Sequence, residues 1–217
     1  MNKFLTHNWL AHEINRKCTL SVLKYVKGDL LDIGCGEKPY FDILTPHINE
    51  YVGLDMPDTL HAKDEIDVHG TACNQPFKDS SFNTIVSFQV MEHVNEPNQM
   101  VAEIYRVLRK GGYAILTTPF MWGLHEEPRD FYRYTKYGLK YLFEKNGFEI
   151  EELKANTGYW IMAGLRFNYY LARFGRGYLK YLLSPIYYLV QVLSLVLDKI
   201  DKVETDTASY LLVARKI

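Results

Sequence analysis

The stretch that decides the fold is Leu30–Tyr40, LLDIGCGEKPY, taken together with Tyr51–Met56, YVGLDM. The first is an apolar strand leading into a turn, where Gly34 and Gly36 let the backbone approach a ligand closely because neither has a Cβ atom. The second is another apolar strand and ends in an acid, Asp55. In nucleotide-binding α/β folds, an acid at the end of the second strand accepts hydrogen bonds from ribose hydroxyls. Together the two stretches predict a nucleoside site.

The turn departs from the dinucleotide fingerprint G-x-G-x-x-G, because Pro39 stands at the third glycine position. A pyrophosphate seated on a helix N-terminus needs close packing and free backbone amides there. Asp32, just before the turn, would repel a phosphate and suits a cationic ligand. S-adenosylmethionine carries an amino group, a sulfonium and a ribose, and it has no phosphate. The turn therefore favours S-adenosylmethionine as the cofactor.

At these residues the chain resembles the class I S-adenosylmethionine-dependent methyltransferases, and within them the family typified by ubiquinone/menaquinone-biosynthesis methyltransferases. A further stretch, Gly70–Val94, is GTACNQPFKDSSFNTIVSFQVMEHV. It resembles the family pattern G-D-A-x-x-L-P-F-x-D-x-S-F-D-x-V followed by V-L-E-H-V. Three residues depart from this pattern: Thr71 and Asn83 replace acids, and Gln75 replaces an apolar residue.

The resemblance implies an α/β fold, a Rossmann-like seven-stranded, mostly parallel sheet with helices on both faces. Strands that alternate with helices along the chain also indicate a parallel sheet. We expect strands at 30–33, 51–55, 84–88, 113–118, 148–153 and 209–216, the last antiparallel. We expect helices within 1–27, at 40–47 and at 98–110, and one that Thr135 caps and Gly147 ends. Residues 57–70 give no clear pattern.

Ligands of such sheets bind outside the carboxyl ends of the strands, so three loops should converge there. The resemblance implies cofactor contacts from Asp32 to the amino group, from Asp55 to the ribose and from Met56 to the adenine. It also implies that the backbone of the glycine turn contacts the methionine moiety, and that further residues lie at the adenine edge, at the sulfonium side and in the family's E-H pair. These residues are, in chain order, Gly34, Cys35, Gly36, Thr71, Ala72, Phe88, Gln89 and His93. For His93, catalysis and a structural role under the loop are alternatives.

The loop Phe120–Thr135, FMWGLHEEPRDFYRYT, is rich in functional groups. It resembles the H-x-x-P-x-D-F-x-R-x-T run of a methyltransferase branch often linked to cell-envelope polysaccharide or glycolipid pathways. In this fold the loop borders the methyl acceptor, so the resemblance places substrate contacts at Trp122 and Tyr132.

Three charged or titratable residues of this loop are candidates for chemistry. A hydroxyl acceptor needs a base, and His125 is the first candidate because its pKa lies near neutrality, with Glu126 second. Arg133 either binds an acidic group on the substrate or pairs with Asp130 and fixes the loop.

About 50 residues, 157–207, separate the last two expected strands and predict a helical insertion beside the mouth of the site. Residues 159–183 mix aromatic and basic side chains, and Pro185 is expected to break the pattern. Ile186–Leu197 is apolar on nearly every face, but twelve residues are too few to span a bilayer. The stretch 159–197 is therefore a lid, a homodimer interface or a shallow membrane contact. Residues 1–27 are expected to form a helical cover over the cofactor.

Composition bounds the remaining possibilities. The chain has 217 residues, 47% hydrophobic and 24% charged, which predicts a single globular domain, 1–217. The formal net charge is −1, so no nucleic-acid partner is expected. Three cysteines, Cys18, Cys35 and Cys73, show no metal-ligand spacing, so no metal is expected and the setting should be reducing and cytoplasmic. The N-terminal residues are too polar for a signal peptide.

These observations leave three hypotheses for function. The favoured one is a metal-independent methyltransferase acting on an oxygen or nitrogen of a small-molecule or lipid/sugar-linked acceptor. It would work in the cytoplasm or at the inner face of the membrane. The second is a methyltransferase of an isoprenoid quinone or similar lipid. The third is a non-catalytic cofactor-binding partner subunit, suggested by the lost acids at positions 71 and 83.

Overall fold

The computed structural model describes residues 3–59 and 64–217. These residues form two compact units, which are described one at a time. The larger unit comprises Thr19–Lys154 and Tyr210–Ile217, and the smaller comprises Met1–Cys18 and Ala155–Ser209.

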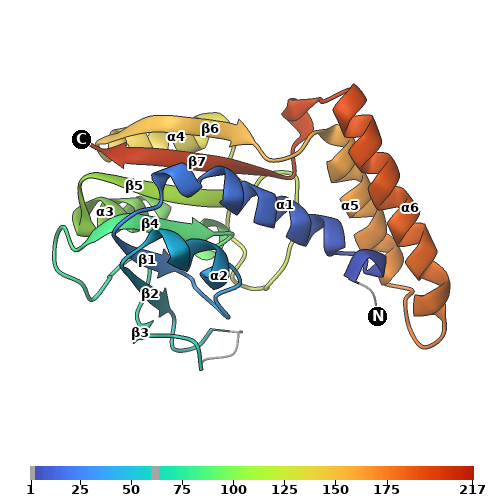
Figure 1. Cartoon of the computed structure of the whole chain (residues 1–217), viewed down its shortest axis with the longest axis horizontal. Helices are drawn as coiled ribbons and strands as arrows, with labels where there is room; N and C mark the ends of the chain where they lie inside the picture. The colour runs from blue at the N-terminus through green and yellow to red at the C-terminus, as the bar shows by residue number, and fades with distance from the viewer. Residues whose placement is uncertain (1–2, 60–63) are drawn as a thin grey trace. The chain divides into compact units, whose positions relative to one another are not determined.

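The larger unit is built on a seven-stranded sheet with the order β3-β2-β1-β4-β5-β7-β6 (Figure 1). The neighbours from β3 to β5 pair in parallel. Figure 1 shows β7 running opposite to β6. The strands are β1 (Asp29–Ile33), β2 (Glu50–Asp55), β3 (Val68–His69), β4 (Phe82–Phe88), β5 (Leu108–Pro119), β6 (Phe148–Ala155) and β7 (Ser209–Lys216). The predicted Rossmann-like fold is confirmed, and β3 lies within residues 57–70, which show no clear pattern in the sequence.

Three α-helices belong to this unit: α2 (Phe41–Leu44), α3 (Pro97–Val107) and α4 (Lys136–Lys145). Short 3-10 turns lie at Leu23–Tyr25, Thr45–His47 and Met91–His93. The core sits between sheet and helices, where the β1 and β4 side chains Leu30, Leu31, Ile85 and Val86 are fully buried. Helix α3 buries an apolar stripe as well: Met100, Val101, Ile104 and Val107. The predicted N-cap of α4 is confirmed, since the Thr135 side chain accepts a hydrogen bond from the backbone of Gly138.

Helix α3 ends at Val107, so the prediction that it runs to residue 110 is wrong. Its last carbonyls accept hydrogen bonds from the backbone N–H groups of Ser80 and Ser81, and Leu108 is already extended. Arg109 therefore lies in β5, where its guanidinium bonds the side chains of Asp29 and Asn83 at 2.8 and 2.5 Å. The competing turn at 80–81 explains the early end of the helix.

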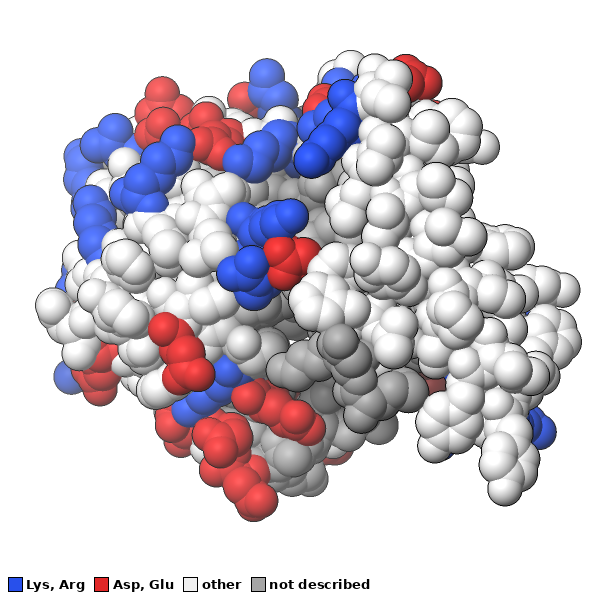
Figure 2. Space-filling view, turned by 45° about the vertical axis from the view of Figure 1, so that its right-hand side comes forward, with Lys and Arg blue, Asp and Glu red and all other residues white. Residues whose placement is uncertain are grey.

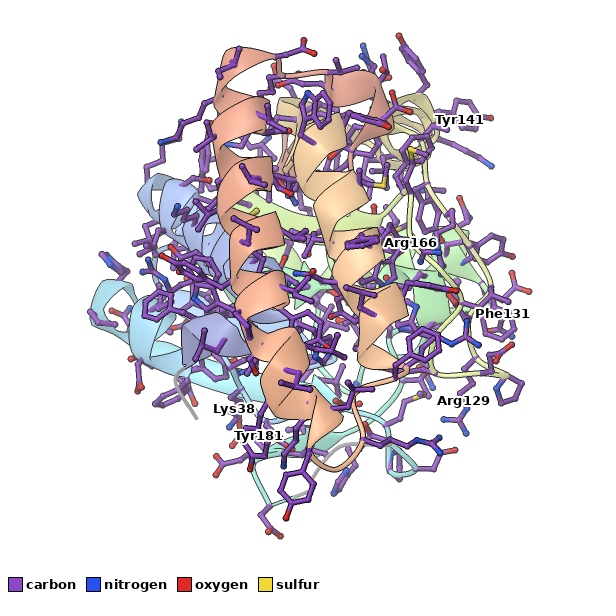
Figure 3. The ribbon with its side chains drawn as sticks, turned by 90° about the vertical axis from the view of Figure 1, so that its right-hand side faces the viewer. Lys38, Arg129, Phe131, Tyr141, Arg166 and Tyr181 are labelled. Carbon is purple, nitrogen blue, oxygen red and sulfur yellow. The ribbon has the colours of Figure 1, made fainter. Side chains whose placement is uncertain are left out.

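The smaller unit contains α5 (Tyr159–Ala172), α6 (Leu179–Ile200), most of α1 (Trp9–Ser21) and 3-10 turns at Lys3–Leu5 and Glu204–Asp206. Helices α5 and α6 lie side by side and antiparallel (Figure 3). Gly164 of α5 permits this approach, because a Cβ atom there would lie 1.9 Å from Ser194 Oγ. Asp198 of α6 accepts a hydrogen bond from the backbone N–H of Gly158, at the start of α5, at 3.2 Å.

Helix α6 continues through Pro185, so the predicted break there is wrong. Proline removes one backbone donor, so this helix lacks one of its i→i−4 hydrogen bonds at residue 185. Helix α6 spans 22 residues instead of the expected twelve, and an 18-residue stretch of it has a mean hydropathy of 1.4, so it is long and apolar enough to cross a membrane by length and composition alone. A core helix of a soluble protein can meet the same criterion, although only 28% of this stretch is buried.

Candidate active site

A cavity of about 230 Å³ opens in the larger unit, at the carboxyl ends of β1, β2 and β4. Six of the residues predicted to bind the cofactor line it: Gly34, Asp55, Met56, Thr71, Ala72 and His93. The sequence did not single out Val90, Cys73 or Asn95, which also line the cavity. Five predicted residues, Asp32, Cys35, Gly36, Phe88 and Gln89, are not among the lining residues.

The glycine turn is held against β2 by Asp55. Gly34 and Gly36 have φ values of +72° and +47°, which L side chains rarely adopt. The backbone N–H groups of Gly36 and Met56 donate to the two carboxylate oxygens of Asp55 at 2.9 and 2.7 Å. Each oxygen keeps a lone pair for a further donor such as a ribose hydroxyl. Asp55 thus shapes the turn as well as the edge of the cavity.

The Val90 side chain packs directly against the Gly34 backbone, which leaves no room for a side chain at position 34. A Cβ atom built there would lie 2.4 Å from Cγ2 of Val90. Valine is stiff at χ1, so it cannot swing away easily. Only glycine fits between β1 and the loop after β4.

Asp32 is buried behind the turn and accepts a hydrogen bond from the Tyr51 hydroxyl. Burial is the main cause that raises the pKa of Asp32 to about 7, and the nearby Asp55 charge adds to it. A cationic group at this place would favour the ionised form. A phosphate would be repelled by the ionised Asp32 carboxylate.

Glu92 forms the centre of a second cluster, beside the cavity. It is fully buried, and burial raises the pKa of Glu92 to about 8. Its Oε1 lies 3.8 Å from Nε2 of His93 and 3.9 Å from Nε2 of His125. The E-H pair in the sequence was the signal that could have identified Glu92.

Comparisons with known proteins agree with this geometry. Residues 31–116 match the family described as a methyltransferase domain. A probable S-adenosylmethionine-dependent methyltransferase of Mycolicibacterium smegmatis is 32% identical over 136 residues, 57% of this chain and 53% of that protein. The chain spans about half the length of the curated relatives it matches. Residues 31–116 are therefore similar to a methyltransferase domain, and the curated relatives that they resemble are named as S-adenosylmethionine-dependent methyltransferases.

Solved structures show how widely this fold is shared. An S-adenosylmethionine-dependent methyltransferase from Archaeoglobus fulgidus superposes with a TM-score of 0.62, 15% identity and coverage of 94% of each chain. The cyclase SpnF superposes with a TM-score of 0.64 at 21% identity, covering 93% of this chain and 80% of SpnF. At such identities the likeness shows the fold alone, since one fold supports different reactions.

The residues at the cavity fit S-adenosylmethionine. The cradle at Gly34 has no room for a side chain, and Asp55 offers acceptors at the cavity edge. Gln89, which sits at φ +58°, has a buried side-chain Nε2 with no hydrogen-bond partner among the described residues. Such an unsatisfied donor is costly unless a ligand accepts from it.

The loop between β5 and α4 is fixed by Arg133. All five N–H donors of its guanidinium are engaged, because it bonds both oxygens of Asp130 and the carbonyls of Trp122, Gly123 and Tyr132. These bonds are the main cause that holds the pKa of Asp130 far below its usual range. Of the two roles left open by the sequence, this geometry favours fixing the loop over binding substrate.

The two candidate bases, His125 and Glu126, lie beside His93. His125 stacks edge-to-face on His93 with ring centroids 4.8 Å apart, and Glu126 Oε2 lies 3.9 Å from Nε2 of His93. Tyr132 donates its hydroxyl to the carbonyl of Asn95, a residue that lines the cavity. The loop that carries the predicted substrate contacts therefore reaches the cofactor cavity through His93 and Asn95.

Proposed function

We propose that the protein transfers the methyl group of S-adenosylmethionine to an oxygen or nitrogen of a lipid- or sugar-linked acceptor. The observation that carries this proposal is the cavity bounded by the glycine turn and Asp55, whose carboxylate holds that turn in place. When bound, the cofactor supplies a methyl group already activated on a sulfonium, so positioning can account for much of the rate.

Each side chain has a defined task in this proposal. Asp55 binds the ribose, Asp32 faces the amino group, and Thr71 with Ala72 borders the adenine. Met56, which also lines the cavity, packs on the adenine face. Phe88, Cys35 and Gln89 support the turn and the sulfonium side from behind.

For a hydroxyl acceptor, a proton must leave as the new bond forms. His125 is the first candidate to accept it and Glu126 the second, since both lie within the loop that reaches the cavity. A nitrogen acceptor that is already unprotonated needs no such base.

Helix α6 supports a lipid-linked acceptor, because its polar and apolar faces are reversed relative to a soluble helix. The side buried within the unit is largely polar and includes Ser184, Gln191, Ser194 and Asp198. An exposed stripe, here called the α6 stripe, consists of Leu182, Ile186, Leu189, Leu193, Val196 and Ile200. In the view of Figure 2, few charged side chains lie over this helix pair. A surface helix normally places its apolar residues toward the core.

The chain between α5 and α6, together with the first turn of α6, carries the groups expected at a membrane surface. It includes the basic residues Arg173, Arg176 and Lys180, with exposed Tyr178 and Tyr181 beside them. Figure 3 shows Tyr181 at the end of the helix pair. Aromatic and basic side chains of this kind sit among lipid head groups. These residues favour a membrane surface over a homodimer as the occupant of the stripe.

One experiment tests both the reaction and the acceptor class. The protein is incubated with methyl-labelled S-adenosylmethionine and a cell extract, which is then separated into lipid, sugar, quinone and protein fractions. Label is expected in a polar lipid or lipid-linked sugar fraction. The double variant Leu189→Glu/Leu193→Glu should lower that labelling about 10-fold or more, because charges on the stripe oppose membrane contact, while cofactor affinity stays unchanged.

The matched control is Tyr137→Glu/Tyr141→Glu, which places two charges at the same spacing on exposed positions of α4. It should label lipid as the unaltered protein does. Label in a quinone fraction would indicate the isoprenoid-lipid alternative. No transfer to any fraction, with the cofactor bound, would overturn the proposed activity in favour of a non-catalytic subunit.

A further inference from the structure

Three side chains beside the cavity converge on one point. One ligand atom from each of Glu92, His93 and His125 lies within 4.8 Å of the other two. They come from the 3-10 turn after β4 and from the loop after β5, so two separate loops bring them together. Two imidazoles and one carboxylate are a donor set that divalent first-row transition ions prefer.

Both imidazoles are oriented so that their Nε2 atoms face Glu92. Nδ1 of His93 lies 2.6 Å from the carbonyl oxygen of Arg129, so it donates its proton there. Nδ1 of His125 faces the carbonyl of Gly123 at 3.3 Å and Asp130 Oδ2 at 3.4 Å. Proteins orient metal-binding histidines in this way, with the outer nitrogen hydrogen-bonded to a carbonyl or carboxylate. The Nε2 lone pairs are thereby left for a ligand.

Glu92 supplies the independent observation. Its side chain is fully buried, yet neither carboxylate oxygen has a hydrogen-bond partner among the described residues. Its Oε1 lies 3.8 and 3.9 Å from the two histidine Nε2 atoms, and both distances are too long for a hydrogen bond. A buried carboxylate without partners is costly, and a cation between it and the imidazoles would remove that cost.

We propose that Glu92, His93 and His125 bind one divalent transition ion, of the class of Zn²⁺. Zinc ligands lie about 2.0–2.2 Å from the ion, which puts tetrahedral ligand atoms about 3.4 Å apart. The separations of Glu92 Oε1 from the two Nε2 atoms, 3.8 and 3.9 Å, exceed that value by about 0.5 Å, and all three ligand atoms lie within 4.8 Å of one another, so side-chain rotations would have to draw them together around the ion. Three protein ligands leave one coordination position open, as in catalytic sites.

The proposal deepens the proposed function, on which its role rests. His93 lines the cavity, so the open position borders the place where an acceptor would sit. A cation there would polarise an acceptor hydroxyl. The O–H bond would break, the proton would pass to Glu126, and the oxygen would form its bond to the methyl carbon as the carbon–sulfur bond breaks. His125 is then a ligand, Glu126 becomes the base, and the expected metal independence is given up.

Metal binding is measured directly, without turnover. The protein is stripped with a chelator and titrated with Zn²⁺ by calorimetry, and Co²⁺ is added separately to record its visible absorption. The unaltered protein should bind one Zn²⁺ and give a Co²⁺ spectrum of low coordination number. Glu92→Gln and His125→Ala should each weaken Zn²⁺ binding about 100-fold. His47→Ala, which removes an exposed histidine elsewhere, should change nothing.

Glu92→Gln keeps the shape of the side chain and removes an unpaired buried charge, so it is expected to fold. Circular dichroism and the affinity for S-adenosylmethionine verify this for each variant. Zn²⁺ affinity that is the same in Glu92→Gln, His125→Ala and the unaltered protein would overturn the site. So would no Zn²⁺ binding to a folded protein. If S-adenosylmethionine still binds in those cases, the proposed function stands without the metal.

Discussion

Gly34→Ala is expected to weaken S-adenosylmethionine binding about 100-fold. Alanine at φ +72° costs about 1–2 kcal/mol, and its Cβ atom would lie 2.4 Å from the Val90 side chain. The turn or the loop after β4 must then move, and both line the cavity. A misplacement of about 1 Å in a binding site can cost about two orders of magnitude. Calorimetric titration measures the affinity, and denaturant unfolding measures the accompanying loss of stability.

Gly111→Ala is the matched control, because Gly111 has φ +76° but a Cβ atom there would meet nothing within 4 Å. It carries the same backbone strain without the clash and lies outside the cavity. It should lose about 1 kcal/mol of stability and keep its affinity for S-adenosylmethionine. Equal affinities in both variants would show that the glycine turn does not shape the cofactor site.

Arg133→Met is expected to lower the free energy of unfolding by about 3 kcal/mol. Its loss leaves the buried Asp130 carboxylate without its main partner, and removing one member of a buried pair costs about 3–5 kcal/mol. It also frees the three carbonyls that fix the loop after β5. Urea unfolding followed by tryptophan fluorescence measures the change.

The single variant Asp130→Asn and the double variant Arg133→Met/Asp130→Asn complete a double-mutant cycle, and the double variant is compared with Arg133→Met. It should recover part of the loss, because the unpaired charge is gone. The alternative role predicts a different pattern: a variant as stable as the unaltered protein, with weaker binding of an acidic acceptor. That pattern would return Arg133 to the substrate site.

Much of the fold could be predicted because its signals are local. Leu30, Leu31 and Ile33 are apolar in sequence and buried in β1, and β7 has the predicted bounds. The predicted cap at Thr135 is local too, since its partner lies three residues away. The resemblance of residues 70–94 to the methyltransferase pattern then predicted how these strands are arranged in the sheet.

The differences arise where distant residues compete for the same groups. Helix α3 ends early because residues 80 and 81 bond its final carbonyls, and the helix pattern cannot show this. The E-H pair alone does not show that Glu92 is buried, because its burial between two loops depends on the folded chain. The sequence allows two roles for Arg133, and only the folded loop shows that all five of its donors are engaged.

The central claim is that the glycine turn and Asp55 together hold one sulfonium nucleoside. Calorimetric titration of S-adenosylmethionine into the unaltered protein, Asp55→Ala and Asp42→Ala, which removes an exposed acid on α2, tests it directly. Asp55→Ala should bind about 100-fold more weakly, because two hydrogen bonds to a charged group are lost, while Asp42→Ala binds normally. If Asp55→Ala binds as tightly as the unaltered protein, the claim is contradicted.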